Sequence, residues 1–470
     1  MNICVDLDGT LIRSDTFHES LLELIKRNPL MLVMVVFWLL RGRAYCKQQV
    51  AARANLPVDS LPYHQPLIEW LKQQKQAGAR LILVTAADQT IAERVAAHVG
   101  IFDEVMASDG QRNLKGTHKR DALNAAFGQH QYLYAGNAQA DWAVWRDAKA
   151  AIVVNASRVV ARKAAQLATV QAEFPRERLG LKRWLKVFRV HQYSKNALIL
   201  VPWILGHQLT HWHALGLVLL GIVCFSLLAS SVYISNDLLD LHSDRKHHSK
   251  CRRALAAGSL SIPTGVVLSV LCLLAAIALA WMLPHAFQFV LLGYYILTCL
   301  YSFLLKRLVL IDVYTLALLY TSRIFAGMAI LDLGYSNWLV LFSFFWFTSL
   351  AFVKRFTELL PMAKSGQKGL HGRGYFADHF MSVKVFGICS GFVSVLIFGL
   401  YLSSEQADAL YLHPQLLYAV CPLLLYWISR VWLLASEGKM HDDPIVFAIK
   451  DRVTYGLLLV VVVIMAVAAY

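Results

Sequence analysis

Residues 236–258 read NDLLDLHSDRKHHSKCRRALAAG and end a long apolar stretch of the chain. Asp237, Asp240 and Asp244 recur at positions i, i+3 and i+7, so a helix through them carries all three carboxylates on one face. So much negative charge at a membrane boundary is costly, and Mg²⁺, which binds carboxylates and bridges to substrate phosphates, is the obvious compensation. Carboxylates that hold a metal, beside cations that hold phosphate, predict a diphosphate site. The cations that follow are Arg245, Lys246, Lys250, Arg252 and Arg253.

The chain around this stretch is too apolar and too long for one soluble domain. It has 470 residues, 57% of them hydrophobic, and a mean hydropathy of +0.49. Residues 1–180 are mixed and charged, whereas residues 196–470 alternate apolar stretches with short polar loops. At roughly 20 residues per span, we expect about nine membrane helices. They lie near 196–208, 212–235, 261–283, 286–305, 309–331, 337–353, 383–403, 415–437 and 453–470.

The net charge of +15 follows membrane topology rather than a nucleic-acid surface. Lys and Arg gather in alternate loops of the apolar half, and the intervening loops contain none. This asymmetry fits the positive-inside rule. We therefore expect a multi-pass protein of the inner (cytoplasmic) membrane, with its N-terminus and basic loops in the cytoplasm and no nucleic-acid partner. An odd number of spans puts the C-terminus outside. The basic loops are 245–253, 306–307, 354–373 and 439–452.

Cysteine and histidine usage predicts neither disulfides nor zinc. The eight cysteines are scattered without a CxxC pair, and most lie in spans or on the cytoplasmic side. His207, His211 and His213 share a short external loop with no acid or cysteine nearby, which favours structural or surface roles. The chain opens directly into an apolar strand, so we expect no signal peptide.

The N-terminal part predicts a parallel α/β sheet. The run NICVDLDGT at 2–10 is an apolar strand that leads into two aspartates and a Gly-Thr turn. Strand and helix patterns alternate after it, and ligands in such sheets bind at the carboxyl ends of the strands. The further strands are expected at 80–85, 104–107, 131–135 and 151–154, and the helices at 65–77, 88–99 and 117–127.

The run DLDGT that begins at Asp6 resembles the first motif of the haloacid dehalogenase-type (HAD) phosphatases. The resemblance covers roughly residues 1–155 and implies that Asp6 is the nucleophile that forms an aspartyl-phosphate. It also implies that Asp8 protonates the leaving group and then activates water. Thr85 matches the hydroxyl of the second motif. Lys115 matches the lysine of the third motif, with Lys119 as the runner-up.

The last HAD motif reads GNAQAD at 136–141 and departs from the family pattern at one position. Asn137 replaces the usual first acid, while Asp141 is kept. An amide oxygen can still bind Mg²⁺, so the resemblance implies a magnesium site one charge weaker, formed by Asp6, Asp8, Asn137 and Asp141. The alternative is a degenerate, non-catalytic HAD domain.

The family inserts a cap between its first two motifs, here at about 14–70. Within it, PLMLVMVVFWLL at 29–40 is too short to span a bilayer and has basic flanks. A helix that dips into the membrane face and a buried cap helix are both compatible with this pattern. Residues 156–186 are rich in Lys and Arg and predict a basic linker, a helical stretch along an anionic surface.

The apolar half, 187–470, resembles the UbiA superfamily of intramembrane prenyltransferases, and within it the decaprenyl-phosphate phosphoribosyltransferase branch. The resemblance rests on RVHQYSKN at 189–196, the aspartate run at 236–258, residues 301–327, and DDPIVFAIKDR at 442–452. It implies an all-helical bundle with a cavity open to lipid that faces the cytoplasm. It also implies phosphoribosyl pyrophosphate (PRPP) and a polyprenyl phosphate as substrates, with Mg²⁺ held by the three aspartates.

The same resemblance selects cations for the substrate phosphates. Lys250 and Arg253 are the first choices, and Asn236 orients a metal ligand or caps a kink. Charges within a span, such as Asp312 and Arg323, are functional by default. The alternative is that Arg323 pairs structurally with Asp312 or with a carbonyl. Tyr301 and Tyr375 are read as interfacial aromatics. The second choices for phosphate are Lys195, Lys354 and Arg355.

The two halves together predict a bifunctional membrane enzyme, and the sequence is compatible with a homo-oligomer. Transfer from PRPP leaves a 5-phosphate on the lipid-linked ribose, and the HAD domain removes it to give polyprenyl-phosphoryl ribose, a precursor of cell-envelope glycans. Fusion raises the local concentration of the intermediate. One alternative is a prenyltransferase that uses a prenyl diphosphate and an aromatic or headgroup acceptor, with a regulatory HAD domain. A third hypothesis is a transporter or scaffold.

Overall fold

The computed structural model describes residues 1–109, 113–177, 179–365, 374–440 and 444–469. These residues form two compact units. The first consists of Met1–Arg189 with Tyr233–Val270, and the second of Val190–Val232 with Leu271–Tyr470. The aspartate run therefore belongs to the same unit as the N-terminal α/β domain. We describe each unit by itself.

The first unit is built on a six-stranded, all-parallel sheet, as the alternation of strands and helices predicts. Its strand order is β3-β2-β1-β4-β5-β6. Val5 pairs with Leu83 of β2 and Ala135 of β4, so the residues that follow each of these three meet at one carboxyl edge. The strands are β1 (Asn2–Val5), β2 (Arg80–Asp88), β3 (Glu104–Ser108), β4 (Tyr132–Gly136), β5 (Ala150–Val154) and β6 (Val170–Phe174).

Helices cover both faces of this sheet because side chains alternate along each strand. On one face, Ile3 and Val5 pack with α4 (Gln65–Gln76) and α5 (Gln89–Val99). On the other face, Cys4 packs with residues of the remaining helices. These are α6 (Thr117–Phe127), α7 (Trp142–Asp147), which follows the short turn η2 (Gln139–Asp141), and α8 (Arg158–Leu167).

The segment 156–186 is not only a linker. It contains α8 and the edge strand β6, which pairs in parallel with β5, and then α9 (Leu181–Val187). The sheet thus continues past residue 155. The high Lys and Arg content hid β6, because an edge strand with one exposed face needs few apolar residues. Arg178 of this segment lies outside the described residues.

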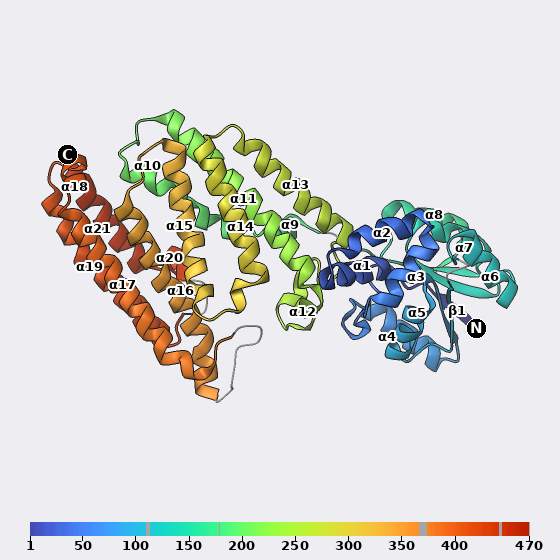
Figure 1. Ribbon diagram of the computed structural model, residues 1–470. Coiled ribbons are helices and arrows are strands. Elements are labelled where there is room, and N and C mark those ends of the chain that lie inside the picture. The colour runs from blue at the N-terminus through green and yellow to red at the C-terminus, as the bar shows by residue number, and fades with distance from the viewer. Residues whose placement is uncertain (110–112, 178, 366–373, 441–443, 470) are drawn as a thin grey trace. The chain divides into compact units, whose positions relative to one another are not determined.

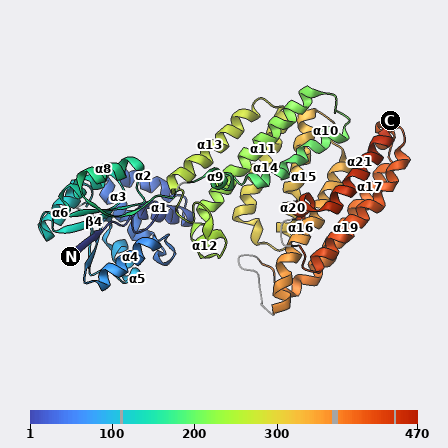
Figure 2. The same cartoon turned by 180° about the vertical axis from the view of Figure 1, so that it is seen from behind.

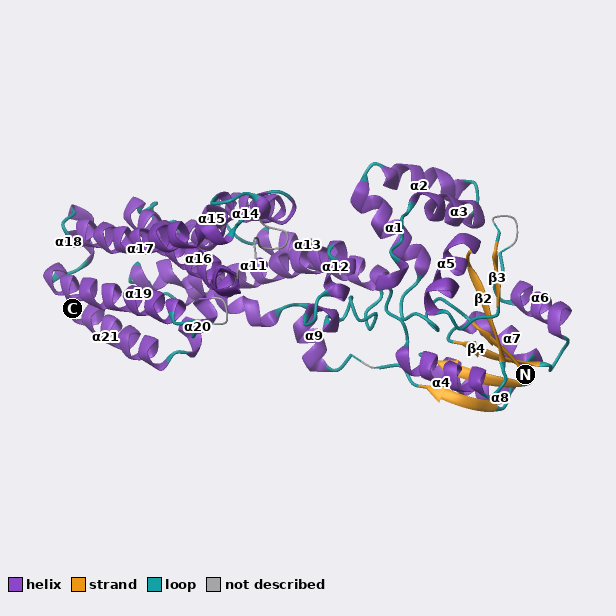
Figure 3. Ribbon diagram, turned by 90° about the horizontal axis from the view of Figure 1, so that it is seen from below, coloured by secondary structure: helices purple, strands orange, loops and turns teal. Residues whose placement is uncertain are grey.

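The cap between β1 and β2 is helical, as expected. It consists of α1 (Thr16–Arg27), α2 (Met31–Leu40), α3 (Arg43–Arg53) and the short η1 (Val58–Ser60). Figure 3 shows α1, α2 and α3 grouped together beside the strands. The alternative of a buried α2 is wrong, because most of its side chains are exposed and only Val35 and Trp38 are buried.

The aspartate run joins the first unit through α12 (Leu241–Lys246) and η4 (Lys250–Arg252). The unit boundaries fall within α11 (Trp212–Leu239) and α13 (Ile262–Ala280). Asp240 has non-helical dihedral angles between α11 and α12, with φ −91° and ψ 11°. The single helix expected through all three aspartates is therefore interrupted at the middle one.

The apolar half is helical, and eight helices of its described residues are long and apolar enough to cross a membrane. The expected span at 196–208 is replaced by two short consecutive helices, η3 (Val190–Leu200) and α10 (Val201–Leu205). The count of nine is thus corrected to eight. The remaining long helices are α14 (His285–Phe303), α15 (Ile311–Leu331), α16 (Asn337–Ser365), α17 (Phe380–Leu402), α19 (Val420–Ser436) and α21 (Arg452–Ala469).

Within the second unit, α15, α16, α17 and α19 lie side by side (Figures 1 and 2) and share one apolar cluster. A second cluster joins η3, α11 and α14 to α15. A Cβ on Gly327 would lie 2.4 Å from the carbonyl oxygen of Ile199, so glycine permits the close approach of η3 to α15. The short connecting elements are η5 (Leu305–Arg307), η6 (Ala377–His379), α18 (Glu405–Leu410), η7 (Pro414–Ala419) and α20 (Pro444–Lys450).

Candidate active sites

The carboxyl edge of the sheet carries a buried lysine–aspartate pair. Asp6 follows β1, and its Oδ1 accepts a hydrogen bond of 2.8 Å from Nζ of Lys119 on α6. The lysine also donates to the hydroxyl of Tyr134 over 2.9 Å. Burial raises the pKa of Asp6 to about 6, although the cation of Lys119 acts in the opposite direction. The buried cation of Lys119 thus fixes the carboxylate of Asp6 at the carboxyl edge of the sheet.

The lysine at this site is Lys119, the runner-up, and not Lys115. Lys115 is exposed, and it precedes α6. Lys119 lies within the first turn of α6, and its side chain is only 4% exposed. Distance along the chain could not separate the two lysines, but the start of α6 at Thr117 does, because it turns Lys119 toward the sheet.

Asp8 lies under the cap. Its Oδ1 accepts a hydrogen bond of 2.8 Å from the backbone N–H of Thr16, the first residue of α1. Burial and the nearby carboxylate of Asp15 raise the pKa of Asp8 to about 7. A carboxyl with this pKa is protonated in a large fraction of molecules at neutral pH, so it can donate a proton and later accept one.

The Asp8 side chain borders a narrow pocket that the cap helices α1 and α3 help to line. Sequence reasoning missed Lys47, which brings a cation to this pocket from α3 and donates to the carbonyl of Ala86 over 3.1 Å. A lysine in a sequence of unknown cap geometry carries no signal of its own. Thr85 is fully buried, and its hydroxyl oxygen accepts the N–H of Ala87.

Asp141 holds the loop that carries Asn137. Its Oδ2 accepts the backbone N–H groups of Asn137 and Ala138, both over 2.9 Å, and its Oδ1 accepts the Tyr134 hydroxyl over 2.8 Å. The Asn137 side chain packs against Gly9, where a Cβ would lie 2.0 Å from Nδ2. Gly9 has φ +77°, so glycine is required there on both counts.

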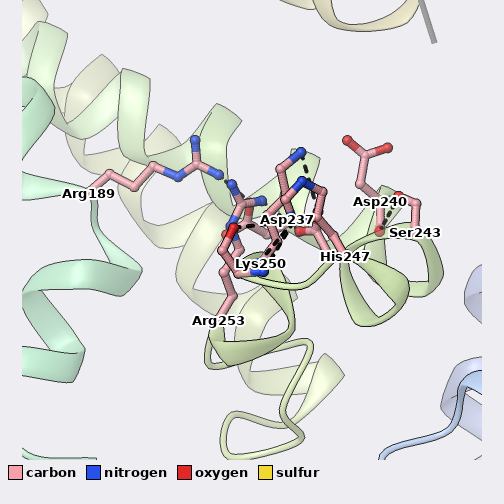
Figure 4. Close-up of polar contacts among 9 residues, drawn as sticks. Arg189, Asp237, Asp240, Ser243, His247, Lys250 and Arg253 are labelled. Atoms are coloured by element: carbon pink, nitrogen blue, oxygen red, sulfur yellow. Dashed lines mark hydrogen bonds and ion pairs between the residues drawn. The ribbon is translucent and has the colours of Figure 1, made fainter. Parts of the chain in front are cut away.

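A second cluster surrounds two carboxylates of the aspartate run (Figure 4). Nη1 of Arg253 donates to Oδ1 of Asp237 over 3.0 Å and to Oδ2 of Asp244 over 2.6 Å. Arg189 also donates to Asp237, and Nζ of Lys250 lies 4.0 Å from Asp244. The Arg253 side chain is 32% exposed and that of Lys250 is 46% exposed, so water reaches this cluster. Arg189 was missed, because it lies far from the run in sequence.

Asp240 does not join this cluster. Figure 4 shows its carboxylate directed away from Asp237 and Arg253. Its carbonyl accepts a hydrogen bond of 2.8 Å from Ser243, which accompanies the break between α11 and α12. Asn236 is half-buried in the last turn of α11. The structure thus brings together Asp237, Asp244, Lys250 and Arg253, and separates the middle aspartate.

Ion pairs connect the cap to α12 within the first unit. Arg245 donates to both carboxylate oxygens of Glu19, over 2.6 and 3.1 Å, and both side chains are almost wholly buried. Lys246 pairs with Asp59 over 2.8 Å. A buried, bidentate arginine–carboxylate pair is geometrically specific, so it fixes α1 of the cap against α12.

In the second unit, Asp312 and Arg355 form a fully buried pair. Nε of Arg355 donates to Oδ2 of Asp312, and the Tyr375 hydroxyl donates to Oδ1 over 2.6 Å. Arg355 also contacts Glu358 and the Tyr301 hydroxyl. Tyr375 is only 1% exposed, so the interfacial reading of this residue is wrong. The tyrosine instead supports a buried charge.

Arg323 lies in a different environment from Asp312. Its Nε donates to Asn196 over 2.9 Å, its Nη2 donates to the Tyr294 hydroxyl over 3.2 Å, and its Nη1 donates to the Leu319 carbonyl. In the described part of the chain, no carboxylate forms an ion pair with it. Of the two structural alternatives for Arg323, the structure shows the hydrogen bond to a carbonyl and not the ion pair with Asp312.

Lys195 and Lys354 also belong to the second unit. Nζ of Lys195 lies 5.4 Å from the centre of the Tyr320 ring, a cation–π geometry. Lys354 is half-buried on α16. Residues 366–373 of the basic loop and the acidic pair at 442–443 lie outside the described residues.

Both carboxylate clusters of the first unit fit Mg²⁺ by their donor chemistry. Carboxylate and amide oxygens are the protein ligands that this ion prefers. Asp6, Asp8 and Asn137 supply them at the sheet edge, and Asp237 and Asp244 supply them beside Arg253. Asp141, which was also predicted as a ligand, instead uses both carboxylate oxygens to accept hydrogen bonds from Tyr134 and from the loop. Among described residues, no group of three or more His, Cys, Asp or Glu side chains is already arranged around a metal. Waters and substrate phosphates would have to complete the coordination.

Two protein-family models match this chain, each over a different part of it. The model of the UbiA prenyltransferase family matches residues 197–450. The model of the haloacid dehalogenase-like hydrolases matches residues 3–146. The family model thus ends before β5, whereas the sheet continues to β6.

Three relatives illustrate these similarities. An uncharacterized protein, y4nM, of Sinorhizobium fredii is 37% identical and aligns with 96% of this chain and 88% of its own length. The nodulation protein NoeC of Azorhizobium caulinodans is 29% identical over 56% of this chain and 85% of its own. A decaprenyl-phosphate phosphoribosyltransferase of Mycolicibacterium smegmatis is 26% identical over 58% of this chain and 88% of its own.

Proposed function

Since this chain belongs to the UbiA prenyltransferase family and carries an HAD-like hydrolase domain, we propose a membrane enzyme with two successive activities. The first transfers 5-phosphoribose from PRPP to a polyprenyl phosphate. The second removes the 5-phosphate and gives polyprenyl-phosphoryl ribose. The similarity to the mycobacterial phosphoribosyltransferase supports the first activity. The buried Asp6–Lys119 pair beside Asp8 supports the second.

In the transfer step, an oxygen of the lipid phosphate bonds to C1 of ribose, and the bond from C1 to pyrophosphate breaks with its electron pair on the leaving oxygen. Lys250 and Arg253 hold phosphate oxygens. Both cations are partly exposed and already lie beside carboxylates, so a phosphate can exchange with those partners. Lys195 and Lys354 remain predicted phosphate contacts.

Mg²⁺ held by Asp237 and Asp244 would neutralise the negative charge that develops on the leaving pyrophosphate. Arg253, which donates to both of these carboxylates, could donate to phosphate oxygens in their place. Asp240, which points elsewhere, would join only after α11 and α12 rearrange. The need for Mg²⁺ is part of the proposal.

In the hydrolysis step, an Oδ of Asp6 attacks the phosphorus and forms an aspartyl-phosphate. Asp8 gives its proton to the departing 5-oxygen of ribose, as its raised pKa allows. Asp8 then takes a proton from water, and the water oxygen displaces Asp6 and releases inorganic phosphate. Lys119 neutralises charge at Asp6. Asn137 in place of an acid weakens the metal site by one charge without removing its oxygen donor.

One observation carries the coupling of the two activities: a phosphatase-type site and a transferase-type carboxylate cluster lie in the same chain. The relative from Sinorhizobium fredii aligns over 96% of the chain, so the two halves occur together there too. Transfer from PRPP leaves the 5-phosphate monoester attached to the lipid product, and a fused phosphatase can act on that product before it diffuses away.

We further propose that the HAD domain and both sites face the cytoplasm in the inner membrane. The distribution of basic loops supports this orientation. The expected outward C-terminus rested on nine spans. The eight spans found among the described residues are an even number, which would place both ends of the chain on the same side of the membrane.

The test is to incubate the purified protein with Mg²⁺, PRPP and a polyprenyl phosphate, and to weigh the lipid product by mass spectrometry. A mass gain of one ribose supports both activities, and Asp6→Asn should convert this gain to that of phosphoribose. Phosphoribose as the end product of the unaltered protein would refute the hydrolysis step.

The family name favours one competing function, transfer of a prenyl group from a prenyl diphosphate to an aromatic or headgroup acceptor. The same assay separates the two. Turnover of a prenyl diphosphate, with no ribose added to polyprenyl phosphate, would replace the phosphoribosyl proposal.

A further inference from the structure

The cap helix α2 is apolar on every side. Its ten residues read MLVMVVFWLL and contain no polar side chain. Only Val35 and Trp38 are buried, at 3% and 5% exposure, and they pack with Leu24 of α1 and with Cys46 and Val50 of α3. The guanidinium of Arg53 lies 4.9 Å from the centre of the Trp38 ring and covers it. Val35 and Trp38, with the partly buried Met31, therefore anchor the helix, and the other side chains face outward.

The outward side chains form one apolar surface. Val33 is 57% exposed, Phe37 is 58% exposed and Leu40 is 79% exposed. Exposed apolar patches of this kind mark sites of interaction with a protein or a membrane. The other contributors are Leu30, Leu32, Met34, Val36 and Leu39.

The charged residues around α2 indicate what kind of partner its apolar surface contacts. Residues 24–58 contain no Asp or Glu, and they contain six cations. Exposed Lys26 and Arg27 end α1 just before α2, and exposed Arg41 follows α2 directly. An apolar surface rimmed by cations alone matches a bilayer with acidic headgroups. The remaining cations are Arg43, Lys47 and Arg53.

The length of α2 limits how deep it can go. Ten residues of α-helix are about 15 Å long, half of the roughly 30 Å hydrocarbon core. The helix can therefore enter one leaflet but cannot cross. The same chain carries eight candidate membrane spans, so the protein is attached to a bilayer.

We propose that α2 inserts its apolar surface into an acidic leaflet, so that the phosphatase site acts on phosphate attached to a membrane lipid. The helix joins α1 to α3, and these two helices line the pocket beside Asp8. Lys47 of α3 borders the same pocket and adds a cation for a phosphate group. The part of this proposal that concerns substrate rests on the proposed function, whereas lipid insertion does not.

Insertion is tested by fluorescence in the full-length protein. A fluorescent amino acid is placed at Phe37, or as a control at exposed Gln73 of α4, and each protein is reconstituted in phosphatidylcholine–phosphatidylglycerol vesicles. Lipids brominated on the acyl chain should quench position 37 and spare position 73. Equal, weak quenching at both positions would overturn the proposal. The proposal would also be overturned if position 37 were shielded from quenching in cross-linked dimers. In that case α2 would contact a second copy of the chain instead of lipid.

The substrate part is tested with the double variant Val33→Asp and Phe37→Asp. Both side chains are exposed, so the fold should persist. Hydrolysis of the phosphoribosyl lipid made by the Asp6→Asn protein should fall at least about tenfold, because two charges oppose insertion. Hydrolysis of soluble p-nitrophenyl phosphate should not change. Val159→Asp, which alters an exposed apolar residue of α8, is the matched control and should affect neither substrate.

The two measurements separate the two proposals. If position 37 is quenched but the unaltered protein does not hydrolyse the phosphoribosyl lipid, insertion stands and the proposed substrate fails. If the unaltered protein hydrolyses that lipid and the double variant does so equally well, the role of α2 is refuted while the proposed function survives.

Discussion

The cluster at Asp237 and the cluster at Asp312 consist of the same residue types but differ in how far water reaches them. Both contain carboxylates held by arginine, and both come from segments that resemble one enzyme family. Arg253, which joins Asp237 to Asp244, is 32% exposed, whereas Arg355 and Asp312 are both 0% exposed. Burial therefore distinguishes charges that can exchange partners from charges that cannot.

The hydrogen-bond partners of each arginine lead to the same distinction between the two clusters. A single nitrogen of Arg253 serves two carboxylates, so a metal ion or a phosphate could take over either contact. Arg355 divides its donors among Asp312, Glu358 and Tyr301, and Tyr375 donates to the second oxygen of Asp312. We infer that the first cluster binds substrate and that the second supports α15 and α16.

The largest expected effect comes from breaking the buried pair. Asp312→Asn leaves the guanidinium of Arg355 buried with Glu358 as the carboxylate that still pairs with it. Loss of one member of a buried ion pair costs about 3–5 kcal/mol. The yield of folded protein in membranes should fall steeply, and the midpoint of thermal unfolding in detergent should drop. If Asp312→Asn folds normally and loses only transfer, Asp312 belongs to the substrate site.

The next largest effect tests the accessible cluster. Asp237→Asn removes a proposed metal ligand from a position that water reaches. Transfer from PRPP should fall by about 100-fold or more, since a metal contributes several kcal/mol of charge stabilisation. The midpoint of thermal unfolding should change little, because the amide can still accept a hydrogen bond. The same protein should still hydrolyse supplied phosphoribosyl lipid, which serves as its internal control.

These contrasts mark what the sequence could predict. The motif DLDGT and the alternation of strands and helices sufficed for the parallel sheet, because both are local patterns. Local spacing also placed Asp237 and Asp244 near Arg253. It failed at Asp240, where a helix through all three aspartates was expected and the structure breaks the helix. Spacing along an ideal helix holds only while the helix continues.

Long-range partners were the other class of error. The pairs Asp312–Arg355 and Arg189–Asp237 join residues 43 and 48 positions apart. No local pattern in one sequence encodes which of several charged residues will meet. The choice between Lys115 and Lys119 failed although the helix at 117–127 was predicted correctly, because the distance to the last motif was given more weight than the position of Lys119 within that helix. Edge strand β6 was hidden by its polar composition.

A smaller effect should follow when the accessible cluster keeps its charge but loses its geometry. Arg253→Lys retains one cation, yet an ammonium lacks the planar fork of donors that can bind two phosphate oxygens at once. Transfer should fall by about tenfold, less than in Asp237→Asn, with a higher apparent KM for PRPP. An Arg253→Lys protein with an unchanged KM would argue that Arg253 positions the aspartates without binding phosphate. Arg252→Lys, at an exposed neighbouring position, is the control.

The smallest effect returns to the buried cluster. Tyr375→Phe removes the hydroxyl that donates to Oδ1 of Asp312 and accepts the N–H of Leu310. The ring still fills its site, so the cost is that of lost hydrogen bonds to a charged group, roughly 1–3 kcal/mol. The midpoint of thermal unfolding should therefore fall by less than in Asp312→Asn, while the KM for PRPP stays constant. A change in KM without a change in stability would mean that Tyr375 senses substrate. The buried cluster would then communicate with catalysis, and exposure alone would no longer separate the two groups of charges.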